Sequence, residues 1–280
     1  MDVQKYLARR KALVDRELER ILARGTGRIY EAMRHAVLGE GMRFRPLLLL
    51  SAAEALGAEA ALALPFACGI EFIHSYSLVH DDLPCMDDDD MRRGRPSCHK
   101  AFGEDVALLA GDALLTLAFE VMADVEIPRR LCPARNQVLL EAARHSGVDG
   151  MIGGQWLDIS FTKDRADVLE SLMRKKTGAL IVLAVRAGAL VAGAKKRQLA
   201  ALTEYGEKLG LAFQIRDDLI DAAETSKKPG LEKPNFAVFA GPEKARRTLF
   251  ELVSEARAAL KGGRIDSPVL RKLADRLLAC

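Results

Sequence analysis

Six aspartates lie within ten positions of this chain, and three arginines follow them. The stretch reads His80-Asp81-Asp82-Leu83-Pro84-Cys85-Met86-Asp87-Asp88-Asp89-Asp90, followed by Arg92, Arg93 and Arg95. Residues 70–79, just before it, are apolar enough to form a core helix. Carboxylates at the end of a buried helix need cations or hydrogen bonds to stay ionised. Oxygen-rich clusters suit Mg²⁺, and guanidinium groups match phosphates bidentately. The pattern predicts a Mg²⁺ and phosphate site, and the alternative interpretation is a solvated acidic loop.

A second acidic cluster lies far along the chain, in Asp217-Asp218-Leu219-Ile220-Asp221. Asp217 and Asp221 are four residues apart, so on a helix they share one face. Like charges repel, so a cation or a lysine must lie close to them. Alone, such a pair is as often structural as functional. Two apolar helices that each end in clustered aspartates can face each other across a cavity and hold several Mg²⁺ ions on one diphosphate.

The elements that must position these residues are helices, because nearly every periodic segment has the helical period and no segment shows convincing strand alternation. Helices are expected at 1–23, 28–38, from Arg45-Pro46 to Gly57, 61–79, 106–125, 137–146, from 155, 179–194 and 199–222, with two more at the C-terminus. Breaks are expected at 83–95, 147–154, 175–178 and 224–234, and Asp164 or Asp167 is a candidate helix cap. We find no linker and no repeat. The chain is therefore predicted to be a single all-α domain covering residues 1–280.

Composition excludes several classes of function. A net charge of +3, with no Lys/Arg tract interleaved with aromatics, argues against nucleic-acid binding. The five cysteines form no CxxC pair, which is typical of reduced thiols in the cytoplasm. The first 19 residues are dense in charge, so we expect no signal peptide.

Two apolar stretches resemble membrane spans in length. Residues 106–125 carry Asp112 and Glu120, and residues 178–194 carry Arg186. A charge at the centre of a span costs about 3 kcal/mol on insertion scales. We therefore expect both to be helices buried on most sides of a large bundle, with no stable membrane insertion.

Between positions 39 and 221 the chain strongly resembles the trans-isoprenyl diphosphate synthases, also called polyprenyl synthetases. The motifs that carry the resemblance are Asp81-Asp82-Leu83-Pro84-Cys85-Met86-Asp87 with Arg92-Arg93, Gly153-Gly154-Gln155 with Asp158, Lys176-Thr177-Gly178, Phe213-Gln214 and Asp217-Asp218-Leu219-Ile220-Asp221, with His74 ahead of the first. They occur in the family's order. The two extra residues Pro84-Cys85 and Tyr76, five before Asp81, are similar to the bacterial farnesyl diphosphate synthase type.

The resemblance implies an isoprenoid synthase fold, a single large helical bundle around a central cavity. It also implies a homodimer and Mg²⁺ as cofactor, with three ions per active site. The implied metal ligands are Asp81, Asp82, Asp87, Asp217 and Asp221. Arg92 and Lys176 would act with the aspartates and grip the allylic diphosphate. The other substrate-binding residues would be Arg45, His74, Arg93, Thr177, Gln214, Lys228 and Lys233, and Tyr76 and Ser77 would set chain length.

The reaction implied is the condensation of allylic diphosphates with isopentenyl diphosphate to give farnesyl diphosphate. The alternatives are a geranylgeranyl or geranyl diphosphate synthase, a terpene cyclase of the same fold, and a non-catalytic subunit of a related synthase. Without the resemblance, His74 would be a hydrogen-bonded core histidine, Lys176 a helix-flanking lysine, and Arg45 an exposed first-turn residue. Gly153-Gly154 would only allow close helix packing.

Two segments depart from the family pattern. The family's Gly-Gly-Lys-Arg-x-Arg-Pro reads here as Glu40-Gly41-Met42-Arg43-Phe44-Arg45-Pro46, so a lysine expected on isopentenyl diphosphate is methionine. The loop after Asp221 is shorter than the family's loop and differs from it in sequence, and Lys228 and Lys233 take the place of the family's two lysines. These changes leave the metal and allylic parts of the site nearly whole and alter the isopentenyl part.

Overall fold

The computed structural model describes residues 2–161, 168–225 and 235–279. Its helices are α1 (Val3–Leu22), α2 (Arg28–Val37), α3 (Phe44–Ala55), α4 (Ala60–Asp81), α5 (Cys98–Phe102), α6 (Glu104–Ala123), α7 (Cys132–Ser146), α8 (Met151–Ile159), α9 (Leu169–Met173), α10 (Ala179–Val191), α11 (Lys196–Thr225), α12 (Phe236–Ala240), α13 (Pro242–Gly262) and α14 (Pro268–Asp275). Shorter helical turns are η1 (Arg129–Leu131), η3 (Arg174–Gly178) and η4 (Arg276–Leu278). The all-α prediction is confirmed, with helix ends within a few residues of those expected.

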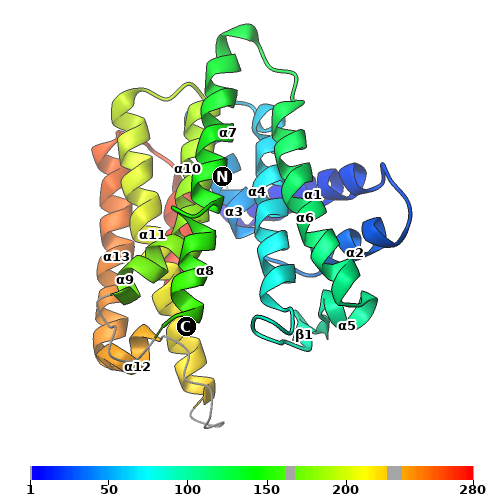
Figure 1. Ribbon diagram of the computed structural model, residues 1–280. Coiled ribbons are helices and arrows are strands. Elements are labelled where there is room, and N and C mark those ends of the chain that lie inside the picture. The colour runs from blue at the N-terminus through cyan, green and yellow to red at the C-terminus, as the bar shows by residue number, and fades with distance from the viewer. Residues whose placement is uncertain (1, 162–167, 226–234, 280) are drawn as a thin grey trace.

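The helices pack in two halves (Figure 1). In one half α4 lies against α6 and α3, and in the other α11 lies between α10 and α13. The apolar helix α10 joins the halves, since it packs on α3 as well as on α11. Helices that are apolar all round belong inside a bundle, because no face of theirs gains from contact with water. The two acidic clusters therefore belong to different halves, one at the end of α4 and one on α11.

Helix α4 ends at the first acidic cluster. It continues two residues beyond the predicted end, so Asp81 is its last residue and Asp82 caps it, with Asp82 N donating to Leu78 O at 3.1 Å. The loop that follows contains a short hairpin of β1 (Met91–Arg92) and β2 (Arg95–Pro96), paired antiparallel. The expectation that this segment holds no strand was wrong. Two-residue strands are too short to show an alternating pattern.

Two of the predicted breaks are helical, one only in part. The chain breaks at residues 147–150 as expected, but helix α8 begins at Met151, so Gly153 and Gly154 lie inside it. A Cβ at Gly154 would lie 2.2 Å from the backbone nitrogen of Lys176, which means that this glycine lets α8 lie directly against η3. Residues Arg174–Gly178 are not an interruption but a π-helical turn (η3) between α9 and α10. Such widened turns often occur at functional sites.

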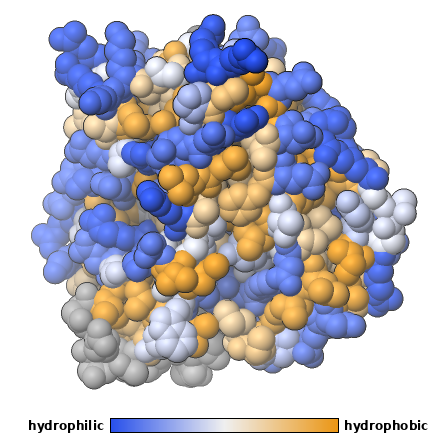
Figure 2. All heavy atoms as spheres, turned by 45° about the horizontal axis from the view of Figure 1, so that its top comes forward, coloured by the Kyte–Doolittle hydropathy of each residue, from blue (hydrophilic) through white to orange (hydrophobic). Residues whose placement is uncertain are grey.

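Helix α6 is less covered than predicted. By length and composition alone, both α4 and α6 are long and apolar enough to cross a membrane. In the most apolar 18 residues of each helix, however, 72% of α4 is buried inside the protein and only 44% of α6. Leu108 and Leu109 are 47% and 54% exposed. Figure 2 shows hydrophobic atoms, in orange, that reach the surface between polar ones. The expectation of burial on most sides was wrong for α6, because α4 and α2 cover only one of its faces. It holds for α10.

Four predictions fall on residues outside the described part of the chain. These are the candidate caps Asp164 and Asp167 and the candidate substrate-binding lysines Lys228 and Lys233. At the C-terminal end the described residues form three helices rather than two, because the short α12 precedes α13 and α14.

Candidate active site

A cavity of about 1340 Å³ lies between the two halves. Asp81 enters it from the end of α4 and Asp217 from α11, so the prediction that the two acidic clusters face one cavity is confirmed for these two residues. Ten of the predicted site residues line it: Arg45, His74, Tyr76, Ser77, Asp81, Arg92, Arg93, Lys176, Thr177 and Asp217.

The negative charges of Asp81 and Asp217 are only partly neutralised by neighbouring cations. Burial raises the pKa of Asp81 to about 6; Lys176 opposes this and the charge of Asp87 adds to it. Burial also raises the pKa of Asp217 to about 6, with Arg216 opposing and Asp221 adding. Carboxylates held together in a partly desolvated cavity are stabilised as anions by a cation. An all-oxygen donor set of this kind fits Mg²⁺.

The remaining aspartates of the two clusters are placed differently. Asp82 is buried, does not line the cavity, and accepts a hydrogen bond from Arg92 Nε at 2.9 Å. This placement does not favour its expected role as a metal ligand, because successive residues of a helix are about 100° apart around its axis and only Asp81 lines the cavity. Asp87 is half-buried and near enough to raise the pKa of Asp81. Asp221 is exposed beside Asp217 and lies outside the cavity lining.

One wall of the cavity is basic. Burial lowers the pKa of Arg45 to about 10, and its Nε is buried with no hydrogen-bond partner among the described residues. Burial lowers the pKa of His74 well below its usual value, and Arg45 and Arg93 lower it further. The His74 imidazole is therefore neutral near pH 7 and can donate one hydrogen bond and accept another. A buried guanidinium nitrogen without an acceptor, opening on a cavity, matches an anionic ligand.

A buried ion pair supports this wall. Arg43 has a left-handed backbone conformation (φ 50°) and is almost fully buried. Its guanidinium donates to Asp15 Oδ1, Glu71 Oε1 and Val37 O, each at 2.7 Å. Met42, its neighbour, is 63% exposed and lines the cavity. Arg43 is thus fully engaged and cannot supply the cation that Met42 lacks.

Hydrogen bonds fix the residues of η3 and α11. Thr177 Oγ1 donates to Gln214 Oε1 at 2.5 Å, and Gln214 Nε2 donates to Asp218 Oδ1 at 2.8 Å. Gln214 is absent from the cavity lining, so it holds Thr177 rather than a ligand. Lys176 Nζ donates to Asp158. Asp218 accepts from the backbone nitrogen of Phe236 at 2.7 Å, and so ties α12 to α11.

Aromatic rings of α4 also line the cavity. Tyr76 is 5% exposed and packs edge-on against the His80 ring, with centroids 5.7 Å apart. His80 lies directly over Gly111 of α6, where a Cβ would come within 2.1 Å of its Nε2. Gly111 therefore allows α4 and α6 to approach closely enough for His80 to support Tyr76.

Several cavity residues had no role predicted from the sequence. Gln155 lines the cavity, and both of its amide atoms are buried without a partner among the described residues, while Trp156 and His80 contribute rings. Glu71 also lines the cavity, and the signal for it in the sequence is a charged residue inside an otherwise apolar helix. No sequence signal distinguishes Trp156 from a surface or core aromatic.

Comparisons with known proteins agree with this geometry. The polyprenyl synthetase family model matches residues 26–235. The chain is 43% identical to a farnesyl diphosphate synthase of Geobacillus stearothermophilus, over 82% of this chain and 79% of that protein, and 42% identical to one of Escherichia coli, over 89% and 88%. Geranylgeranyl diphosphate synthases match as well, at 40% identity for the one from Cyanophora paradoxa, over 90% of this chain and 88% of that protein.

Solved structures also match this chain. A crystal structure of a farnesyl/geranylfarnesyl diphosphate (FPP/GFPP) synthase from Zymomonas mobilis superposes with a TM-score of 0.90 at 36% identity, covering 99% of both chains. This likeness confirms the predicted isoprenoid synthase fold. With a family model that matches three quarters of its length and an all-α fold in which Asp81 and Asp217 meet in one cavity, this chain belongs to the polyprenyl synthetase family.

Proposed function

We propose that this chain is a cytoplasmic, Mg²⁺-dependent short-chain prenyltransferase. It condenses dimethylallyl and geranyl diphosphates with isopentenyl diphosphate to give farnesyl diphosphate, and residues 1–280 act as one domain. The observation that carries the proposal is the cavity itself. The cavity is lined by two carboxylates with raised pKa values, by a guanidinium and an amide with buried atoms that have no partner among the described residues, and by the ring of Tyr76.

The metal-binding part of the site consists of Asp81, Asp87 and Asp217, with Asp221 beside it, and we propose that it holds three ions. Bound Mg²⁺ neutralises the negative charge that develops on the departing diphosphate. We leave Asp82 out of the ligand set. Its role is to hold Arg92, whose guanidinium lies at 2.9 Å from both Asp82 Oδ1 and Asp89 Oδ2.

The side chains of the cavity bind and orient the two substrates. Arg92 and Lys176 contact the allylic diphosphate, and Arg45, Arg93 and neutral His74 contact isopentenyl diphosphate. As the allylic C–O bond breaks, the double bond of isopentenyl diphosphate forms the new C–C bond. The released pyrophosphate accepts the proton that is lost, so no protein nucleophile is needed. Apolar walls exclude the water that would quench the allylic cation.

Product length depends on the floor of the cavity. Tyr76 and Ser77 lie one helical turn before Asp81, which is about 6–7.5 Å deeper along α4. The growing chain runs toward them because its diphosphate is fixed at the aspartates. We propose that Tyr76, supported by His80, ends the cavity after a fifteen-carbon chain. A wider cavity would give the geranylgeranyl product, which is the activity named for several relatives and is not the one favoured here.

We propose that the protein is a homodimer. The exposed face of α6, with Leu108 and Leu109, is an apolar surface that a second copy would cover. Light scattering of the eluting protein gives the oligomeric state directly. Leu108→Glu together with Leu109→Glu is expected to shift it to monomer, and a monomeric parent protein contradicts this part of the proposal.

The experiment that tests the function is product analysis. Purified protein is incubated with Mg²⁺, dimethylallyl diphosphate and isopentenyl diphosphate, and the products are identified by chromatography and mass. A terpene cyclase would release hydrocarbons from a supplied prenyl diphosphate, and a non-catalytic subunit would release nothing. Asp81→Ala and Asp217→Ala are expected to lower turnover by orders of magnitude, while the exposed Asp105→Ala serves as matched control. Full activity in excess EDTA refutes the metal requirement.

A further inference from the structure

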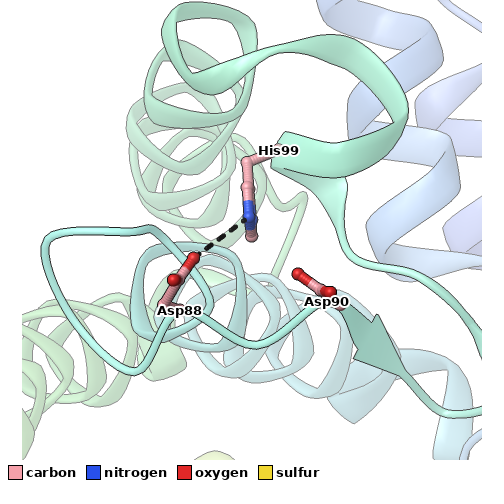
Figure 3. A group of neighbouring side chains, drawn as sticks. All are labelled: Asp88, Asp90 and His99. Atoms are coloured by element: carbon pink, nitrogen blue, oxygen red, sulfur yellow. Dashed lines mark ion pairs between the residues drawn. The ribbon is translucent and has the colours of Figure 1, made fainter.

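Three potential metal ligands meet outside the cavity, at the surface beside α5. The nearest ligand atoms of Asp88, Asp90 and His99 all lie within 4.8 Å of one another. Figure 3 shows His99, from α5, pointing toward the loop that carries the two aspartates. None of the three lines the cavity. Both aspartates are exposed, and exposed carboxylates alone carry no conclusion.

His99 supplies the second observation. Its side chain is only 2% exposed, and its Nε2 is buried with no hydrogen-bond partner in the part of the chain that the structure describes. That nitrogen faces Asp88 Oδ1 at 3.9 Å, which is too long for a hydrogen bond. The other ring nitrogen, Nδ1, lies 3.1 Å from Ser97 Oγ. In the tautomer where Nδ1–H donates to Ser97, Nε2 presents its lone pair to the two carboxylates. Metal-binding histidines are held in this way through their second nitrogen.

The donor set selects the class of cation. Imidazole suits zinc and its transition-metal neighbours, whereas Mg²⁺ prefers oxygen ligands alone. Zinc binds histidine nitrogen and carboxylate oxygen at about 2.0–2.2 Å, so two ligand atoms on one ion are at most roughly 4.2 Å apart. The His99–Asp88 pair already meets this limit, and an exposed carboxylate can rotate to bring Asp90 within it.

We propose that Asp88, Asp90 and His99 form a second metal site, for a divalent transition-metal ion of the zinc class. The site is separate from the Mg²⁺ carboxylates of the cavity. An ion there joins the acidic loop to α5 and fixes the segment that contains Asp89, the second partner of Arg92. Lys100 competes with the ion, because its Nζ lies 2.8 Å from Asp90 Oδ1.

The test is a titration of the metal-stripped full-length protein with Co²⁺ and with Zn²⁺ under excess Mg²⁺. Asp81→Asn with Asp217→Asn serves as parent, so that the two aspartates that line the cavity do not contribute. One Co²⁺ per chain is expected, with an absorption spectrum that reports a nitrogen ligand, and Zn²⁺ displaces it. His99→Ala is expected to weaken binding at least tenfold, and Lys100→Met to strengthen it. His145→Ala, outside the cluster, is the control.

Failure of the proposal is recognisable even if His99→Ala does not fold. Asp88→Asn and Asp90→Asn change only exposed side chains, so each variant keeps the fold and must weaken Co²⁺ binding. Unchanged Co²⁺ affinity in these variants, or displacement of Co²⁺ by Mg²⁺ in the parent, overturns the proposal. The readouts are binding and absorption, so they do not depend on whether the cavity carries out prenyl transfer.

Discussion

Replacing Met42 with lysine tests how the basic wall recognises isopentenyl diphosphate. Met42 lines the cavity and is 63% exposed, and the neighbouring guanidinium of Arg43 is fully engaged by Asp15, Glu71 and Val37. The native chain therefore offers no free cation at positions 42 and 43. Met42→Lys adds an ammonium group on a side chain of similar length, with no change in the packed core.

The expected gain follows from the strength of a charged hydrogen bond. Such a bond contributes about 1.5–3 kcal/mol. Because position 42 is exposed, solvent screening favours the lower figure. About 1.5 kcal/mol is roughly a tenfold decrease in the KM for isopentenyl diphosphate. The contact is the same in the ground state and the transition state, so kcat and the allylic KM stay unchanged.

Steady-state kinetics with a saturating allylic substrate measure this effect. Met42→Gln keeps the length without the charge and is the matched control. Glu40 also lines the cavity and competes for the introduced ammonium group, so Glu40→Gln with Met42→Lys should show the larger gain. The gain should shrink as salt is added, because exposed charges are screened. An unchanged KM in both of these variants refutes the assignment of this segment to isopentenyl diphosphate.

Three further predictions follow from packing and charge. Tyr76→Ala should shift the products from fifteen carbons toward twenty and longer, and an unchanged profile in an active variant places the floor elsewhere. Gly154→Ala should push η3 away from α8 and raise the allylic KM at least tenfold, whereas Gly262→Ala, with open space around it, should not. Arg186→Leu leaves Glu141 buried and unpaired, and should lower the free energy of unfolding by about 3–5 kcal/mol near pH 7. Burial raises the pKa of Glu141, but its hydrogen bonds from Arg186 and Gln137 lower it overall, so the stability from this pair is present above about pH 4.3 and lost below it. In urea unfolding, the difference in the free energy of unfolding between the parent protein and Arg186→Leu should decrease as the pH falls through that range. A constant difference would contradict the reasoning.

The sequence predicted those parts of the site that depend on spacing along one helix. Asp81 at a helix end and Asp217 on a helical face could be placed because the period of the helix fixes the face. The same reasoning could not place Asp82, which differs from Asp81 by one residue and about 100° around the helix axis. Its partner Arg92 lies ten residues further on, beyond a loop whose path is not encoded in any period.

Features that arise between elements were missed for a related reason. The Arg43–Glu71 pair joins residues 28 positions apart, and only the packed fold shows that each is the other's partner. The exposed face of α6 could not be predicted because apolar composition gives no information on what covers a helix. The π-helical turn at Arg174–Gly178 depends on Gly154 of another helix, so its own residues indicated only a break.

The hydrogen bonds of Arg43 reduce the free-energy cost of ordering the protein when a substrate binds. Its guanidinium is held by Asp15 of α1, Glu71 of α4 and the carbonyl of Val37, so three elements fix the segment that leads to Arg45. The side chains that we propose to face the diphosphate are therefore preorganised before any ligand arrives. A preorganised site loses little conformational entropy on binding, so a smaller number of contacts gives the same affinity. This explains physically how the chain can tolerate Met42 at a position where the family carries lysine.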